Sequence, residues 1–152
     1  MTIEHIILSG GGPTGFITYG VLKHLAKEKY WNLNKIKTIY GTSIGAFVGV
    51  IISLNYKWKT LDNYLIKRPW DKIISIEPEE LFSAFNRKGI LNINIITQAI
   101  QPLLAGKQLS IDIPLAEFYN YNNIEIHLYS IDINASEFNK VDISYKTHPD
   151  MR

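Results

Sequence analysis

The chain has 152 residues and a mass of 17.4 kDa, which is enough for one domain with its own hydrophobic core. Hydrophobic residues make up 46% and charged residues 20%, and the formal net charge is only +2 with scattered basic residues, so we predict no nucleic-acid partner. The sequence contains no cysteine, which excludes disulfides, thiolate metal sites and a cysteine nucleophile.

The first half of the chain predicts alternating strands and helices. The unalternated apolar run over residues 4–9 is typical of a strand buried on both faces of a parallel sheet. An amphipathic helix is predicted from residue 15 or 16, where apolar residues begin to recur at helical spacing. Residues 36–40 predict a second strand, and a mostly apolar helix follows from residue 44. This order predicts a right-handed crossover and a parallel sheet.

The second half of the chain predicts further helices and then strands. We expect helices within residues 55–70, from residue 77, over 92–104 and over 114–119, and strands over 124–133 and 140–145. The longest apolar run, residues 44–54, is far shorter than the ~20 residues that span a bilayer, and predicts a buried helix. We therefore expect one soluble α/β domain over residues 1–152, and the lack of cysteine favours the cytoplasm.

A glycine-rich turn, Gly10-Gly11-Gly12-Pro13-Thr14-Gly15, lies between the first predicted strand and helix. Successive glycines leave backbone N–H groups uncovered beside a helix N-terminus, which favours a phosphate or a tetrahedral oxyanion. The string also fits the dinucleotide-binding pattern, but that fold needs an acidic residue at the end of its second strand. Here the second strand ends in Gly41-Thr42-Ser43, and no Walker-type Gly-Lys-Ser/Thr is present.

A second motif, Gly41-x-Ser43-x-Gly45, falls on the predicted turn between the second strand and its helix. Flanking glycines permit a tight turn, here called the elbow, that exposes a nucleophilic serine. Both turns should emerge at the carboxyl edge of the sheet, facing each other across a candidate oxyanion site. The two motifs together predict that Ser43 is the nucleophile of an acyl hydrolase, and that backbone N–H groups of Gly10, Gly11, Gly12 and Ile44 bind the oxyanion.

These two motifs, together with residues 20–25, resemble the N-terminal part of patatin-like phospholipases. The resemblance continues more loosely at residues 88–91, 115–118, 131–134 and 148–151. It implies a three-layer α/β/α fold with a mainly parallel sheet and a Ser–Asp dyad in place of a triad. It also implies hydrolysis of acyl esters in phospholipids or neutral lipids without a metal or other cofactor. We also expect transient association with a membrane surface.

Two departures from that family's pattern affect the predicted site. Thr14 stands where the family usually carries Arg or Lys, and Pro13 has no N–H, so Gly11 and Gly12 should carry the oxyanion contact. The family's aspartate lies in an Asp-Gly motif downstream, and no Asp in this chain is followed by Gly. Neither Asp132 nor Asp150 matches that position. We therefore expect a C-terminally incomplete domain that lacks the base of the dyad.

Two alternatives remain open. An α/β-hydrolase triad would need His127 or His148 with an acid such as Asp112, but that fold places several strands before the elbow, and His127 falls within an apolar strand as a structural residue would. The other alternative is an inactive patatin-like fold that binds lipid or protein.

Two further features have structural interpretations that we favour over functional ones. Four aromatic residues would suit a membrane interface, although packing in the helical layer is the favoured interpretation: Trp31, Tyr56, Trp58 and Trp70. The acid pair Glu79-Glu80 has no third ligand at metal-binding spacing, so we predict no metal site.

Overall fold

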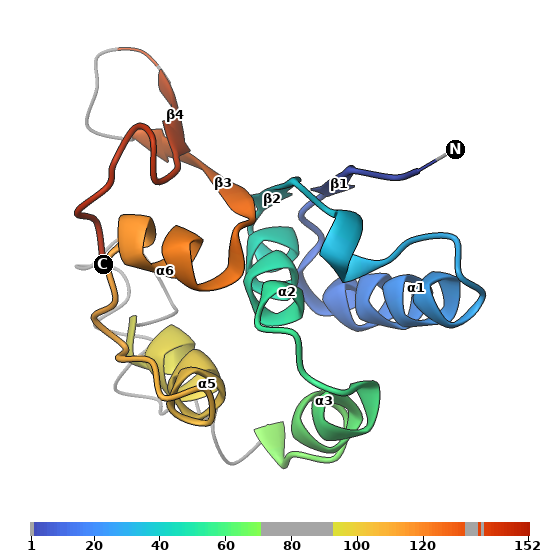
Figure 1. Cartoon of the computed structure of the whole chain (residues 1–152). Coiled ribbons are helices and arrows are strands. Elements are labelled where there is room, and N and C mark those ends of the chain that lie inside the picture. The colour runs from blue at the N-terminus through green and yellow to red at the C-terminus, as the bar shows by residue number, and fades with distance from the viewer. Residues whose placement is uncertain (1, 71–92, 133–136, 138) are drawn as a thin grey trace. The chain divides into compact units, whose positions relative to one another are not determined.

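The computed structural model in Figure 1 describes residues 2–70, 93–132, 137 and 139–152. It consists of two compact units. The first is formed by Met1–Trp58 together with Asp112–Arg152, and the second by Lys59–Ile111. The helix expected from residue 77 and the resemblance at residues 88–91 lie outside the described residues.

The first unit is built on a mixed sheet. Its strands are β1 (His5–Leu8), β2 (Thr38–Thr42), β3 (Glu125–Asp132) and β4 (Asn139–Ile143), in the order β1-β2-β3-β4. The first three strands are parallel and β4 is antiparallel to β3. The predicted α/β class with a mainly parallel sheet is confirmed.

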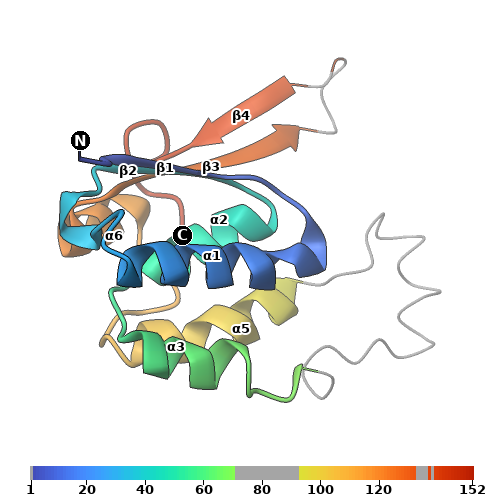
Figure 2. The ribbon, with the colours of Figure 1, turned by 90° about the vertical axis from the view of Figure 1, so that its right-hand side faces the viewer.

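The helices of this unit lie on one side of the sheet, as Figures 1 and 2 show. They are α1 (Gly15–Lys27), α2 (Ile44–Ser53) and α6 (Leu115–Asn122). The Asn122 side-chain amide donates a 3.2 Å hydrogen bond to the Ser53 hydroxyl, which ties α6 to the end of α2. The described residues of this unit therefore supply two of the three layers that the resemblance implies.

The hydrophobic core lies between the sheet and these helices. Ile6, Ile39 and Ile126 stand opposite one another in the strand register and are at most 8% exposed. Successive strand residues point to opposite faces, so this row faces the helices. On α2, Ile51 is fully buried, and such burial contributes about 2 kcal/mol per large aliphatic side chain. This explains why α2 is apolar on most sides.

The prediction that the first strand is buried on both faces is wrong. Burial alternates along β1, and Ile7 is 80% exposed, whereas Ile6 and Leu8 are buried. Ile7 points to the face opposite the helices, where no helix of the described first unit packs. A run of apolar residues without alternation therefore indicated a strand correctly, but not its surroundings.

The aromatic residues of the helical side take part in packing. Trp31 is 7% exposed, and its indole N–H donates a 2.9 Å hydrogen bond to the Leu22 carbonyl. Its ring meets Trp58 edge-on at 6.2 Å between centroids. These contacts agree with the packing interpretation favoured for Trp31 and Trp58.

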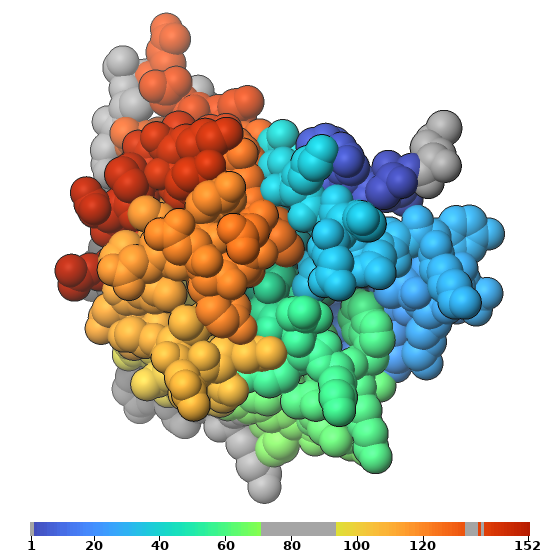
Figure 3. Space-filling view, viewed as in Figure 1, coloured from blue at the N-terminus to red at the C-terminus, as the bar shows by residue number. Residues whose placement is uncertain are grey.

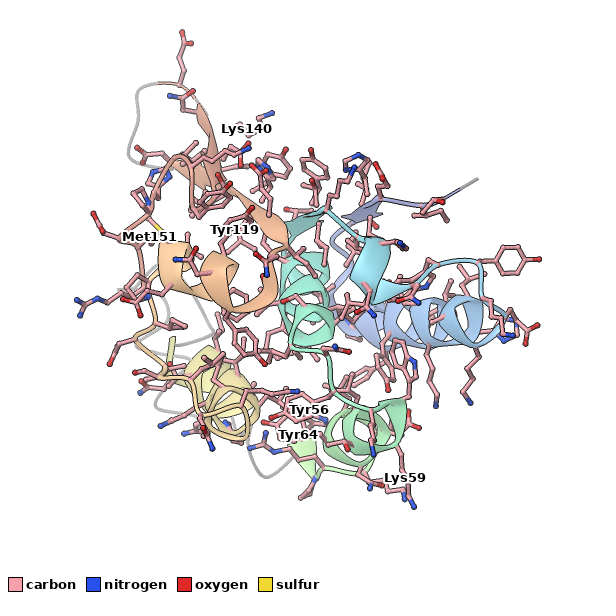
Figure 4. The ribbon with its side chains drawn as sticks, in the orientation of Figure 1. Tyr56, Lys59, Tyr64, Tyr119, Lys140 and Met151 are labelled. Atoms are coloured by element: carbon pink, nitrogen blue, oxygen red, sulfur yellow. The ribbon has the colours of Figure 1, made fainter. Side chains whose placement is uncertain are left out.

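The second unit contains most of α3 (Trp58–Leu65) and all of α5 (Ile93–Ala105). The Tyr64 hydroxyl donates a 2.8 Å hydrogen bond to the Ala99 carbonyl and joins the two helices, and Figure 4 labels this tyrosine. Burial raises the pKa of Tyr64 above its ordinary value. Among the described residues, no helix is both long and apolar enough to cross a membrane.

Candidate active site

Ser43 occupies a sharp turn between β2 and α2. Its φ of 52° and ψ of −129° place it on the left-handed side of the backbone map, which costs a non-glycine residue about 1–2 kcal/mol. The Ser43 carbonyl accepts hydrogen bonds from the N–H groups of Ala46 at 3.0 Å and Phe47 at 3.3 Å, so the first turn of α2 holds the strained residue in place. The side chain of Ser43 is exposed to solvent.

The glycines on either side of Ser43 allow backbone segments to approach more closely than any side chain would permit. A Cβ atom on Gly41 would lie 2.5 Å from Cα of Ala46, in the first turn of α2. A Cβ atom on Gly45 would lie 2.5 Å from the Leu8 carbonyl oxygen and 2.6 Å from that of Ser9. Packing therefore requires both glycines of the G-x-S-x-G motif. Gly41 allows the first turn of α2 to lie against β2, and Gly45 allows the start of α2 to contact the end of β1.

The glycine loop after β1 lies beside Ser43. A Cβ atom on Gly10 would be 3.2 Å from the Ser43 Cβ atom, so the two turns touch. At the other end of the loop, a Cβ atom on Gly15 would be 2.2 Å from Cγ1 of Ile44, so α1 begins directly against α2. The predicted juxtaposition of the two turns at the carboxyl edge of the sheet is present in the structure.

Thr14 holds the glycine loop in shape. Its hydroxyl donates a 3.0 Å hydrogen bond to the Gly11 carbonyl, and its backbone N–H donates to the same oxygen at 3.2 Å. Gly12 between them has a φ of 54°, which glycine adopts without strain. The sequence interpretation treated Thr14 only as the loss of a cation. Thr14 lies three residues after Gly11, a spacing at which a threonine hydroxyl can bind a backbone carbonyl. That spacing is the sequence signal that could have identified this role.

The loop and the start of α2 can together stabilise negative charge next to Ser43. The first N–H groups of a helix have no partner within the helix, and the positive end of its dipole lies there. Ile44 begins α2, so its N–H is such a group, one residue after the proposed nucleophile. Gly11 and Gly12 add exposed backbone in the adjacent loop. This arrangement suits the oxyanion that forms on a carbonyl oxygen when a hydroxyl at position 43 attacks the carbonyl carbon.

His127 is held away from Ser43 by a cluster of charged and aromatic side chains. Its Nδ1 lies 2.8 Å from Oδ1 of Asp142, and its Nε2 lies 3.1 Å from Oε1 of Glu125. Its ring stacks on Tyr40 at 4.7 Å between centroids, on the sheet face opposite α2. The structure thus gives His127 a structural role, as the sequence interpretation favoured, with carboxylate partners that it did not identify.

The other candidate partners of Ser43 lie in separate places. His148 Nδ1 contacts the neighbouring Thr147 hydroxyl at 2.9 Å. Asp132 ends β3, three residues beyond the pair of Thr42 and Tyr129 in the strand register. Within the described part of the chain, no carboxylate or imidazole forms a hydrogen bond with the Ser43 hydroxyl. Among the residues that the structure describes, Ser43 and the glycine loop therefore lie together, with no acid or histidine hydrogen-bonded to the Ser43 hydroxyl.

The C-terminal segment packs on the start of α6 rather than on the elbow. The Leu115 and Ala116 N–H groups donate hydrogen bonds to the carbonyls of Met151 at 2.9 Å and Pro149 at 3.0 Å. Tyr119 on α6, labelled in Figure 4 with Met151, stacks on Tyr145 with ring centroids 3.9 Å apart. In the residues that the structure describes, no group of three or more His, Asp or Glu side chains is arranged to hold a metal ion.

Comparison of the sequence with known proteins identifies the family of this chain. The sequence profile described as patatin-like phospholipase matches residues 6–152. "Probable lipid hydrolase 463L" of Invertebrate iridescent virus 6 is 26% identical over 149 residues, which cover 96% of this chain and 48% of that protein. "Uncharacterized protein R571" of Acanthamoeba polyphaga mimivirus is 27% identical over 105 residues, 69% of this chain and 35% of that protein.

A solved structure shares the fold. It is the heterodimeric complex ExoU-SpcU from the type III secretion system of Pseudomonas aeruginosa, with a TM-score of 0.55 and 19% identity over 98% of this chain and 34% of the matched chain. The present chain spans about a third to a half of the length of the curated relatives it matches. The match of the family profile to nearly the whole chain shows that this protein belongs to the patatin-like phospholipase family.

Proposed function

We propose that this protein is a serine acyl hydrolase that cleaves acyl esters of lipids, with Ser43 as its nucleophile. The contact between the glycine loop and the elbow carries the proposal, because a Cβ atom on Gly10 would lie 3.2 Å from that of Ser43. An exposed serine in a strained strand-to-helix turn, beside uncovered N–H groups, is suited to acyl transfer. The name of the iridescent virus relative, a probable lipid hydrolase, supports a lipid substrate.

In the proposed reaction, the Ser43 hydroxyl oxygen attacks the ester carbonyl and its proton passes to a base. The carbonyl oxygen becomes an oxyanion, which accepts hydrogen bonds from the N–H groups of Ile44 and of Gly11 or Gly12. The tetrahedral intermediate collapses as the alcohol leaves with the proton, and water then hydrolyses the acyl-enzyme. The family resemblance implies an aspartate as the base, and we propose that it belongs to polypeptide outside these 152 residues.

The test uses a fluorophosphonate probe and a p-nitrophenyl acyl ester with the wild-type chain and its Ser43→Ala variant. Ser130→Ala is a matched control, since Ser130 is also exposed but lies within the regular strand β3. We expect slow covalent labelling that Ser43→Ala abolishes and Ser130→Ala leaves unchanged, with at most trace ester turnover. Equal labelling of both variants would refute Ser43 as the nucleophile, and rapid Ser43-dependent turnover would refute the missing base.

The absence of a base in hydrogen-bonding contact with Ser43, within the described residues, favours a second candidate function. In that case the chain is a patatin-like fold that binds lipid or protein without catalysis. The same probe separates the two functions, because a binding module would sediment with lipid vesicles while leaving Ser43 unlabelled.

A further inference from the structure

Arg68 is held in a fixed position in the turn that follows α3. Its guanidinium carbon lies 4.6 Å from the ring centroid of Tyr64 and 5.1 Å from that of Trp70. Its Nη1 group donates a hydrogen bond to the Tyr64 hydroxyl, and its Nη2 group donates one of 3.2 Å to the Gln98 carbonyl on α5. The Trp70 indole N–H in turn donates a 2.7 Å hydrogen bond to the Leu65 carbonyl. An arginine that is already ordered loses little further conformational entropy when it binds a ligand.

Pro102 explains why the Gln98 carbonyl is available to Arg68. In an α-helix this carbonyl would accept a hydrogen bond from the N–H of residue 102, and the proline at that position in α5 has none. The contact therefore has a structural role, because it satisfies the carbonyl. A guanidinium group has five N–H donors, and hydrogen bonds within the described residues use two of them. No acidic side chain pairs with Arg68 in that part of the chain, so the other donors can bind an anion.

The turn over residues 66–70, named here the α3 turn, combines basic, aromatic and apolar side chains. Ile66 is 57% exposed and Lys67 beside it is exposed, whereas Trp70 is half-buried. The Trp70 backbone N–H donates a 2.9 Å hydrogen bond to the Arg68 carbonyl, so the turn has a defined conformation. An exposed isoleucine next to Lys, Arg and Trp is typical of polypeptide at the boundary between water and a bilayer.

The region around the α3 turn is positively charged. Residues 58–70 contain three cations and one acid, which are Lys59, Lys67 and Arg68 against Asp62. Figure 3 shows α3, in green, at the surface of the molecule, and Figure 4 labels Lys59, which is exposed on that helix. Anionic headgroups attract basic residues next to a membrane, and a planar guanidinium group pairs with two phosphate oxygens at once. An anionic phospholipid surface therefore complements the charge of this region.

The chemistry of the α3 turn favours a lipid surface over other anionic partners. A nucleic acid would pair with Lys67 and Arg68 but would leave Ile66 in water, and so few cations make a weak site for a phosphate backbone. Inorganic phosphate would also leave the isoleucine exposed. A phospholipid layer supplies a phosphate group for Arg68 and, just below it, an apolar layer for Ile66.

We propose that the α3 turn binds the surface of a membrane that contains anionic phospholipid, with Arg68 on a phosphate group and Ile66 inserted below the headgroups. This inference rests on the proposed function for its choice of a lipid surface, because a hydrolase of lipid esters has to reach its substrate in a lipid layer. Binding at the α3 turn requires no reaction of Ser43, so the membrane contact and the hydrolase activity can be tested separately.

The test measures which part of the chain contacts a lipid vesicle. The sequence has no cysteine, so an introduced cysteine can carry a single NBD fluorophore, whose emission rises in apolar surroundings. Ile66→Cys reports on the α3 turn. Ile131→Cys is the matched control, because Ile131 is also 57% exposed but lies on β3 in the other unit. The vesicles contain phosphatidylcholine alone or phosphatidylcholine with about 30% phosphatidylserine.

We expect the emission at position 66 to rise roughly twofold with the anionic vesicles, with little change at position 131 or with phosphatidylcholine alone. Lys67→Gln and Arg68→Gln should each weaken sedimentation with anionic vesicles about fivefold. Lys27→Gln is the matched control, because it removes an exposed cation from α1. Lys67→Gln leaves the contacts of Arg68 with Tyr64 and Gln98 in place, so it tests the proposal even if Arg68→Gln unfolds the chain.

Equal changes in emission at positions 66 and 131, or no change at either, would overturn the proposal. Equal weakening by Lys27→Gln and Lys67→Gln would also overturn it, because attraction would then depend on net charge alone. Equal responses to both kinds of vesicle would overturn the role of the anionic headgroup. Fluorophosphonate labelling of Ser43, measured without vesicles, tests the proposed function independently: vesicle contact at position 66 without labelling would support the α3 turn and refute the hydrolase.

Discussion

Replacing Gly45 with alanine should damage both the stability of the elbow and the reactivity of Ser43. The new Cβ atom would lie 2.5 Å from the Leu8 carbonyl oxygen, whereas ordinary contacts begin at 3.4 Å. The start of α2 and the end of β1 must therefore separate by nearly 1 Å, judged from the van der Waals distances involved. Overpacking of this kind costs about 1–3 kcal/mol of unfolding free energy.

Gly20→Ala supplies the control for this substitution. Gly20 lies within α1, and a Cβ atom there meets nothing within 4 Å, so the same chemical change is unopposed. We expect it to stabilise the chain by about 0.5–1 kcal/mol, since alanine is the better helix former.

The assay combines urea unfolding, followed by tryptophan fluorescence to which buried Trp31 contributes, with the rate of fluorophosphonate labelling. Gly45→Ala should lower the unfolding free energy and slow labelling by roughly 100-fold, since a displacement of 1 Å has effects of that size on reacting groups. An unfolding free energy as high as that of Gly20→Ala, with normal labelling, would refute the inference that close backbone contact positions the elbow.

Three further outcomes are expected. Thr14→Val, which lacks the hydroxyl that binds the Gly11 carbonyl, should label about 2- to 10-fold more slowly, whereas Thr14→Ser should label normally. Ser43→Gly should be more stable to urea than Ser43→Ala by about 1 kcal/mol, because glycine adopts the positive φ without strain, and equal stabilities would contradict that strain. The hydrogen bond to Glu125 raises the pKa of Lys146 above 10.5, so its stabilisation is present below that pH and is lost as pH rises through the raised value. Urea titrations at increasing pH should show that loss in the wild-type chain and not in Lys146→Met.

The elements that surround the candidate site could be predicted from the sequence because each carries a local signal. The first helix was predicted from residue 15 or 16 and begins at Gly15, and the second was predicted from residue 44 and begins at Ile44. Both boundaries follow glycine turns, in which a change of hydrophobic period coincides with residues that permit unusual backbone angles. The glycine motifs and the change in hydrophobic periodicity therefore indicated the same starting residues for α1 and α2.

Features that depend on distant parts of the chain could not be predicted in the same way. The exposure of Ile7 depends on which layer covers its face of the sheet, which a four-residue apolar strand does not encode. The carboxylate partners of His127 come from β3 itself and from β4, whose antiparallel pairing had no signal in the sequence pattern. Placing such residues requires the strand register, which local periodicity does not determine.

Ile44 links the two helices to the candidate oxyanion site through a single residue. Its backbone begins α2 next to Ser43, and its side chain fills the space that a Cβ atom on Gly15 would occupy. A larger residue at position 15 is therefore compatible with this packing only if position 44 becomes smaller. We expect positions 15 and 44 to vary together among relatives. A search for such compensated pairs would show which combinations of side chains preserve the contact between α1 and α2 beside the elbow.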